Sequence, residues 1–246
     1  MKEHYTSARF IPRFFSFVLQ KLLWMPSRIF LHIFCHLTFY GSDTYKQLPK
    51  GVIFAANHTN IFDFIFVPLH IGFFSRRHPI HYTGKAPHLF PRKTWLSYVF
   101  VNKFTFYLTS THIAHRGLKN YSISLKEHVE VIKEGNDMVI FPNGAIDIDE
   151  NQFPKGGISY LVGKTKAPVV PVYIKGAFKV RLRDVLMRKV KISIYYGEPL
   201  YYEDLFADLE SYNEFDRYKI VARKIMDEIL LLPHKNTQKI GINLLS

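Results

Sequence analysis

Residues 52–63 read Val-Ile-Phe-Ala-Ala-Asn-His-Thr-Asn-Ile-Phe-Asp, an apolar run followed at once by a histidine and an aspartate. The apolar run is typical of a buried strand, and ligands of α/β folds bind where such strands end. Residues five apart on one helix point roughly 140° away from each other, because each residue turns the helix by about 100°. If the two side chains meet, His58 must precede a helix that has Asp63 in its first turn and Thr59 or Asn60 as N-cap.

A histidine held by a carboxylate can act as a general base. An unperturbed imidazole has a pKa of about 6.5, so it can accept a proton at neutral pH. A carboxylate bonded to the other ring nitrogen fixes the tautomer and stabilises the imidazolium. The same spacing also fits a helix cap followed by a solvated acid, so the rest of the chain has to decide between the two.

Strand-like and helical segments alternate along the chain. Runs rich in β-branched and aromatic residues predict strands at 51–56, 79–84, 104–110, 138–142, 168–174 and 190–196. Helical periodicity is clearest at 118–134 and in a C-terminal segment that starts near Ser211 and Glu214, which have capping-box spacing, and ends at Pro233. The alternation predicts an α/β fold with a mostly parallel or mixed central sheet flanked by helices.

Residues 1–45 predict a membrane-associating helical segment. They are dense in Phe, Leu and Ile, but Arg13, Lys21 and Arg28 leave no uncharged run of the ~20 residues that a spanning helix needs. Residues 46–234 are then the α/β domain, and residues 235–246 are a C-terminal tail.

The N-terminal pattern is amphipathic. On a helix, Arg9, Arg13, Ser16 and Gln20 fall in one narrow wedge opposite a broad apolar side, and Pro26 interrupts the segment. We expect a helix-break-helix that lies in one leaflet without crossing the bilayer. A hydrophobic hairpin buried against the α/β domain is the alternative.

Composition narrows the class of partner. The formal net charge of +13 implies an anionic partner, which includes nucleic acid, an anionic bilayer surface and phosphate-bearing substrates. Cys35 is the only cysteine, which excludes an internal disulfide framework and a Cys-based zinc site. We expect a reducing compartment and no metal site.

Four short blocks follow one another in a recognisable order. Asn57–Asp63 is the first, T-S-T-H-I-A-H-R ending at Arg116 is the second, F-P-N-G-A-I at 141–146 is the third, and the apolar strand V-V-P-V-Y at 169–173 is the fourth. Their order and separations resemble the glycerolipid (lysophospholipid) acyltransferases of the 1-acylglycerol-3-phosphate acyltransferase type. The resemblance covers roughly residues 50 to 176.

This resemblance implies a reaction. His58, oriented by Asp63, would take the proton from a hydroxyl of a lysophospholipid such as 1-acylglycerol-3-phosphate, in phospholipid biosynthesis or remodelling. The acceptor oxygen would attack the thioester of acyl-CoA or acyl carrier protein, without a cofactor. The resemblance also implies an enzyme that works at the cytoplasmic face of a membrane.

The resemblance also assigns phosphate contacts. Arg116 matches the arginine of the second block and would bind a phosphate through charge-assisted hydrogen bonds. Lys85 and Lys155 are further candidates. An arginine in a basic surface loop and two solvated lysines are the alternatives.

The third block departs from the family pattern F-P-E-G-T-R. Asn143, Ala145 and Ile146 replace its glutamate, threonine and arginine, while Gly144 is retained. An amide cannot fix a cation and an isoleucine cannot hold a phosphate. Since this block binds the acceptor in the family, Asn143 and Gly144 predict an acceptor site with altered headgroup choice.

A non-catalytic basic protein that binds lipid or nucleic acid is the competing class. The altered third block is the best argument for a silent lipid-binding relative. The sequence carries no nucleic-acid-binding motif, and its positive charge is spread over the chain, so nucleic acid is not the expected partner.

Overall fold

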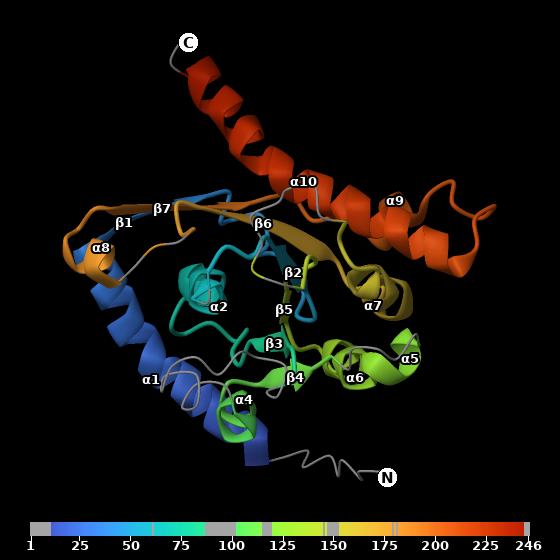
Figure 1. Ribbon diagram of the computed structural model, residues 1–246, viewed down its shortest axis with the longest axis horizontal. Helices are drawn as coiled ribbons and strands as arrows, with labels where there is room; N and C mark the ends of the chain where they lie inside the picture. The colour runs from blue at the N-terminus through green and yellow to red at the C-terminus, as the bar shows by residue number, and fades with distance from the viewer. Residues whose placement is uncertain are drawn as a thin grey trace.

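The computed structural model describes residues 11–60, 62–86, 102–114, 120–144, 146, 153–178, 180 and 182–243. Within these residues a seven-stranded sheet has the order β1-β7-β6-β2-β5-β3-β4, and helices cover both of its faces (Figure 1). The strands are β1 (Cys35–Tyr40), β2 (Ile53–Ala56), β3 (His81–Gly84), β4 (Thr111–Ile113), β5 (Met138–Ile140), β6 (Val169–Lys175) and β7 (Val190–Tyr196).

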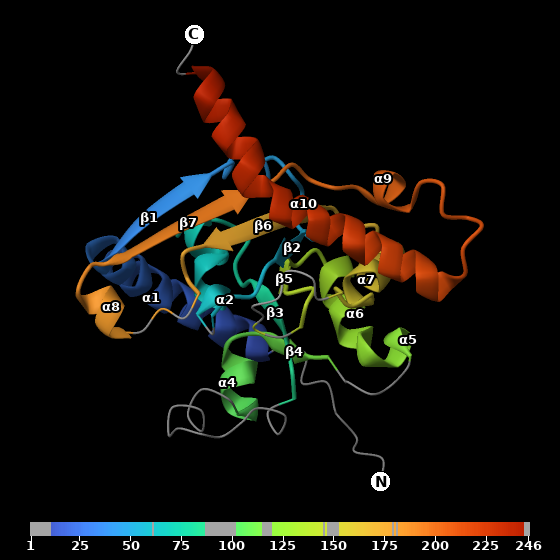
Figure 2. The ribbon, with the colours of Figure 1, turned by 45° about the horizontal axis from the view of Figure 1, so that its top comes forward.

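The sheet is mixed. Strands β2 to β6 are parallel to one another, whereas β7 is antiparallel to β6 and parallel to β1. The arrows of β1 and β7 accordingly point against that of β6 in Figure 2. The predicted α/β class with a mostly parallel or mixed sheet is confirmed.

The helices are short except for the first and the last. They are α1 (Ile11–Phe34), α2 (Asp63–Phe66), the 3-10 turn η1 (Pro68–His70), α4 (Lys103–Leu108), α5 (Tyr121–Ser124), α6 (Lys126–Lys133), α7 (Gly157–Thr165), α8 (Leu182–Leu186), α9 (Tyr202–Phe206) and α10 (Glu214–Asn243).

Strand β2 separates two cores. Its four residues are fully buried and alternate between the faces of the sheet. Phe54 and Ala56 face the core shared with α2, η1 and the last turns of α1, and Ile53 and Ala55 face the core shared with α6, α7 and α10. Burial on both faces explains why this strand is a continuous apolar run.

One predicted strand, 104–110, is wrong. Residues 104–108 belong to helix α4 instead, because Asn102 caps its first turn with a side-chain oxygen that accepts from the N–H of Thr105 at 2.9 Å. A local cap therefore overrides the strand propensity of the aromatic and β-branched residues. The strand starts only afterwards, at Thr111 in β4.

The two predicted helices are displaced at their ends. Residues 118–134 were predicted as one helix, but the described part of them forms α5 and α6, which are separated at Leu125. Helix α10 begins at Glu214, and the residues that bond across its start are Asn213 and Asp216, not Ser211 and Glu214. It also runs past Pro233, and its last turns project away from the body (Figure 1).

The predicted helix-break-helix is wrong. Helix α1 continues through Pro26, and the chain then enters β1, whose backbone pairs with β7. Proline removes one helical hydrogen bond, and contacts with the body support the helix on both sides of it. The Trp24 indole donates to the carbonyl of Ile71 at 2.7 Å, and Arg28 donates to that of Leu69 at 3.1 Å. Among the described helices, none has the length and hydropathy to cross a bilayer.

A buried ion pair closes the amino edge of the sheet. Asp137 accepts the N–H groups of Gly51 and Val52, both at 2.9 Å, and pairs with Arg77 at 2.8 Å. Arg77 also donates to two backbone carbonyls of the 45–48 turn. This clasp joins the starts of β2 and β5 at the end of the sheet opposite to His58.

Candidate active site

The histidine and the aspartate of the first block are in contact. His58 lies in the loop after β2, and Asp63 is the first residue of α2. The Nδ1 atom of His58 lies 2.9 Å from Oδ2 of Asp63. The carboxylate is wholly buried, while about a fifth of the histidine side chain is exposed. The order predicted from the spacing, histidine before the helix and acid in its first turn, is confirmed.

The N-cap prediction is wrong. Phe62 occupies the cap position of α2 and makes no side-chain cap bond. The N–H groups of Thr59 and Asn60 donate instead to Oδ2 of Asp63, at 2.5 and 2.8 Å. They compensate the buried carboxylate, and they are therefore already engaged and do not provide an oxyanion site.

Two asparagines fasten the 57–60 loop, which carries His58, to β6 and to the segment that follows it. Asn57 donates from Nδ2 to the carbonyl of Ile174 at 3.0 Å and accepts from its N–H at 2.7 Å. Asn60 donates to the carbonyl of Ala177 at 3.0 Å. These contacts hold both ends of the turn that carries His58, a role that the sequence pattern did not reveal.

The first and third blocks meet at an aromatic contact. The ring of His58 stacks on the ring of Phe141, with centroids 4.2 Å apart and planes inclined by 19°. Phe141 directly follows β5, the neighbour of β2 in the sheet. The imidazole is thus held by Asp63 at one nitrogen and covered by Phe141 on one face.

The third block forms a turn at the same edge. Gly144, with φ of +66°, donates its N–H to the carbonyl of Phe141 at 2.9 Å. Asn143 is buried, and its Oδ1 has no hydrogen-bond partner within the described part of the chain. The N–H of Lys155 donates to the carbonyl of Pro142 at 3.0 Å, which places the backbone of Lys155 beside the turn.

The remaining predicted residues are placed in part. Lys85 follows β3, whose carboxyl end lies on the same edge as those of β2 and β5, because the three strands are parallel. Ile146 is half exposed. Arg116 and Ala145 lie outside the described residues.

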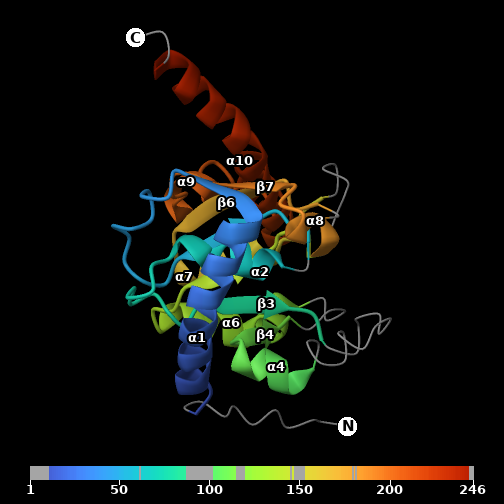
Figure 3. The ribbon, with the colours of Figure 1, turned by 90° about the vertical axis from the view of Figure 1, so that its left-hand side faces the viewer.

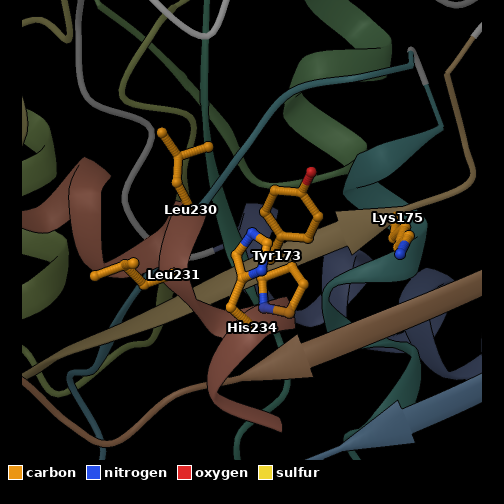
Figure 4. Close-up of a pocket in the computed structure, with 6 residues that line it drawn as sticks. Tyr173, Lys175, Leu230, Leu231 and His234 are labelled. Atoms are coloured by element: carbon orange, nitrogen blue, oxygen red, sulfur yellow. The ribbon is translucent and has the colours of Figure 1, made fainter. Parts of the chain in front are cut away.

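A separate hollow lies between β6 and the second half of α10. Its volume is about 330 Å³, and Figure 4 shows its lining residues Tyr173, Lys175, Leu230, Leu231, Pro233 and His234. None of them belongs to the His58–Asp63 pair. Among the described residues, no cluster of three or more His, Cys, Asp or Glu side chains could hold a metal ion.

Comparison with known proteins identifies the family of the chain. The model of the acyltransferase family matches residues 36–175, which is more than half of the chain and includes both His58 and Asp63. The chain therefore belongs to the acyltransferase family, as its resemblance to the glycerolipid acyltransferases predicted.

One solved structure has a similar fold. The chain is similar to the crystal structure of the 1-acyl-sn-glycerophosphate (LPA) acyltransferase PlsC from Thermotoga maritima, with a TM-score of 0.51 and 21% identity over 85% of this chain and 79% of that chain. At this identity the similarity shows a shared fold. A search of curated proteins found no significant match.

Proposed function

We propose that this acyltransferase moves a fatty acyl group from a thioester donor, acyl-CoA or acyl carrier protein, to a hydroxyl of a lysophospholipid. The observation that carries the proposal is the His58–Asp63 pair at the carboxyl edge of the sheet. Asp63 engages Nδ1, and Nε2 of His58 makes no hydrogen bond within the described part of the chain. This nitrogen is the one that would meet the acceptor.

The reaction then follows from general base catalysis. His58 accepts the hydroxyl proton at Nε2 while the acceptor oxygen forms a bond to the thioester carbonyl carbon. Asp63 stabilises the imidazolium, the tetrahedral intermediate collapses with cleavage of the C–S bond, and His58 returns the proton to the leaving sulfur. The acyl group passes directly from donor to acceptor, so no nucleophilic side chain is needed.

The surroundings of the pair support a lipid substrate. Phe62 and Phe64, the neighbours of Asp63, are exposed to 54% and 37% of their surface, and Phe178 is exposed to 39%. The bond between Asn60 and the carbonyl of Ala177 brings the segment of Phe178 to the same loop. Aromatic surface exposed beside His58 suits an acyl chain, because its contact with water is unfavourable and its contact with hydrocarbon is favourable.

The acceptor headgroup is set by the third block in this proposal. A buried amide oxygen without a partner is unfavourable unless a ligand supplies a donor, and Asn143 Oδ1 fits a hydroxyl or another N–H or O–H group of the acceptor. Ile146 contributes no positive charge to a phosphate. The acceptor preference is therefore expected to differ from that of relatives with F-P-E-G-T-R.

We also propose that α1 docks on the cytoplasmic face of a membrane. Its polar residues point toward the protein, since Ser16 and Gln20 donate to the carbonyls of Tyr107 and Ile80 at 3.1 and 2.7 Å. Trp24 and Arg28 continue this row one and two turns later. Lys21 donates to the carbonyl of Ser75 at 3.3 Å, so it also turns toward the body.

The opposite side of α1 is apolar and uncovered. Figure 3 shows the helix along the outside of the body. Its large hydrophobic residues with 38–67% of their surface exposed are Phe14, Phe15, Phe17, Leu22, Leu23, Met25, Ile29, Phe30 and Ile33. Such a face fits the acyl layer of one leaflet, and the net charge of +13 favours anionic headgroups around it.

The test of the reaction uses wild type and His58→Ala with a labelled acyl donor and a panel of lysophospholipids. The substitution should abolish transfer and leave binding to vesicles unchanged. A lipid- or nucleic-acid-binding protein without activity would show no transfer in either form, and equal transfer in both would rule out His58 as the base.

Vesicle sedimentation tests the membrane surface. Phe14→Ser with Leu22→Ser should weaken binding to vesicles that contain anionic lipid, whereas Phe215→Ser, an exposed aromatic on α10, is the matched control. Equal binding by all three proteins would contradict docking through α1.

A further inference from the structure

We propose that Phe141 is a positioning residue for the His58 base, and that its ring sets the plane of the imidazole so that Nε2 faces the acceptor hydroxyl. This inference rests on the proposed role of His58. It connects the third block, otherwise associated with the acceptor, to the proton transfer itself.

One hydrogen bond leaves the histidine incompletely fixed. The contact of Nδ1 with Asp63 places one ring atom, but terminal torsions of aromatic side chains are broad and the ring can still tilt about this contact. A flat neighbour removes that freedom. With its centroid 4.2 Å away and its plane inclined by 19°, the Phe141 ring covers one face of the imidazole and leaves the Nε2 edge to the substrate.

Phe141 is itself held in place. It follows the buried residues of β5, packs against the core under α2, and its carbonyl accepts the N–H of Gly144 at 2.9 Å. The next carbonyl, that of Pro142, accepts the N–H of Lys155 at 3.0 Å. The backbone of Phe141 is therefore fixed by a hydrogen-bonded turn at the end of β5.

The chain contains a second stack of the same kind. Phe39 lies on the ring of His70, with centroids 5.1 Å apart and planes inclined by 25°. His70 contacts neither Asp63 nor the 57–60 loop in the described hydrogen bonds, and it packs with Tyr45 and Tyr196 instead. This pair is a matched control for the loss of a Phe–His stack.

The experiment compares kcat and KM of acyl transfer in Phe141→Leu, Phe141→Met, Phe141→Tyr and Phe39→Leu. Leucine and methionine nearly conserve volume, so the fold should persist, but they offer no flat ring. Both should lower kcat by roughly ten- to a hundredfold, as expected for a misoriented catalytic group, with KM little changed. Tyrosine should restore kcat, and Phe39→Leu should leave it unchanged.

Rescue by tyrosine separates positioning from general damage, because Phe141→Tyr keeps the flat ring that the leucine and methionine variants lack. Unchanged kcat in both variants, or an equal loss in Phe39→Leu, would overturn the inference. If either of these outcomes is found while His58→Ala is inactive, the proposed function stands and only the role of Phe141 is overturned. If His58→Ala is active, both the proposed function and the role of Phe141 are overturned.

Discussion

Two wholly buried aspartates lie at opposite edges of the sheet and have nearly the same surroundings. Asp63 at the carboxyl edge and Asp137 at the amino edge each accept two backbone N–H groups and each pair with one basic side chain. The partner distances are 2.9 Å to His58 and 2.8 Å to Arg77. What differs is the base.

The basic partner decides whether the buried aspartate stabilises the fold or supports proton transfer. Arginine side chains are always charged, and Arg77 donates further hydrogen bonds to two backbone carbonyls. Its ion pair with Asp137 therefore stabilises the fold and takes no part in proton transfer. His58 can take up and release a proton, and its second nitrogen is left without a partner in the described chain. The same buried carboxylate thus supports structure at one edge and supports the proposed catalysis at the other.

The largest contrast is expected from Asp63→Asn beside Asp137→Asn. An amide at position 63 no longer stabilises the imidazolium, and acyl transfer should fall by about 10²- to 10⁴-fold. The rate per folded molecule of the Asp137→Asn variant should stay within about twofold of wild type, as expected for a site remote from the chemistry. Rate assays corrected for the folded fraction check this, and equal losses in both variants would break the comparison.

The free energy of unfolding, in contrast to the rate, should depend on the Arg77–Asp137 pair. Arg77→Met leaves Asp137 as a buried charge without its partner, which should reduce the free energy of unfolding by about 3–5 kcal/mol. Lys46→Met, which breaks the exposed pair with Asp43, is the control and should hardly change it. Urea unfolding measures both, and a stable Arg77→Met protein would show that the clasp is dispensable.

The choice of acceptor should change only through the carboxyl edge. Asn143→Glu and Ile146→Arg, singly and together, restore the charges of the family pattern and should shift kcat/KM between lysophospholipid headgroups by roughly tenfold. Ile123→Arg adds the same charge at an exposed site on α5 and serves as control. An unchanged headgroup preference in the double variant would count against the proposed role of this block.

The smallest expected effect is a change in the loss of stability at acidic pH. Burial, together with Lys46 and Arg28, lowers the pKa of His70 to about 4. Because the folded state disfavours the proton, His70 contributes its stability above pH 6.5, and this is lost as the pH falls toward 4. His70→Phe keeps the stack with Phe39. Its melting temperature should fall less between pH 7 and pH 5 than that of wild type. His78, whose pKa burial also lowers to about 4, should preserve the rest of the acid sensitivity.

Local pattern and tertiary context contributed differently to the fold. The strands at β2, β5, β6 and β7 followed from apolar and β-branched runs, because strands buried in the sheet need such side chains. Residues 104–108 carry similar side chains and still form a helix, since the cap at Asn102 decides the local backbone. The continuation of α1 through Pro26 depends on bonds to distant carbonyls, which no local pattern records.

The sequence alone determined that β2 is a buried strand and that His58 precedes the helix that Asp63 begins, because the apolar run and the helix geometry act over a few residues. The stack of His58 on Phe141 joins residues 83 positions apart, and only the pairing of β2 with β5 brings them together. The amphipathic pattern of α1 likewise revealed two faces but not their direction. The tertiary structure decided it, since backbone carbonyls on the body, those of Tyr107 and Ile80, accept the polar side chains of α1 and turn its polar face inward.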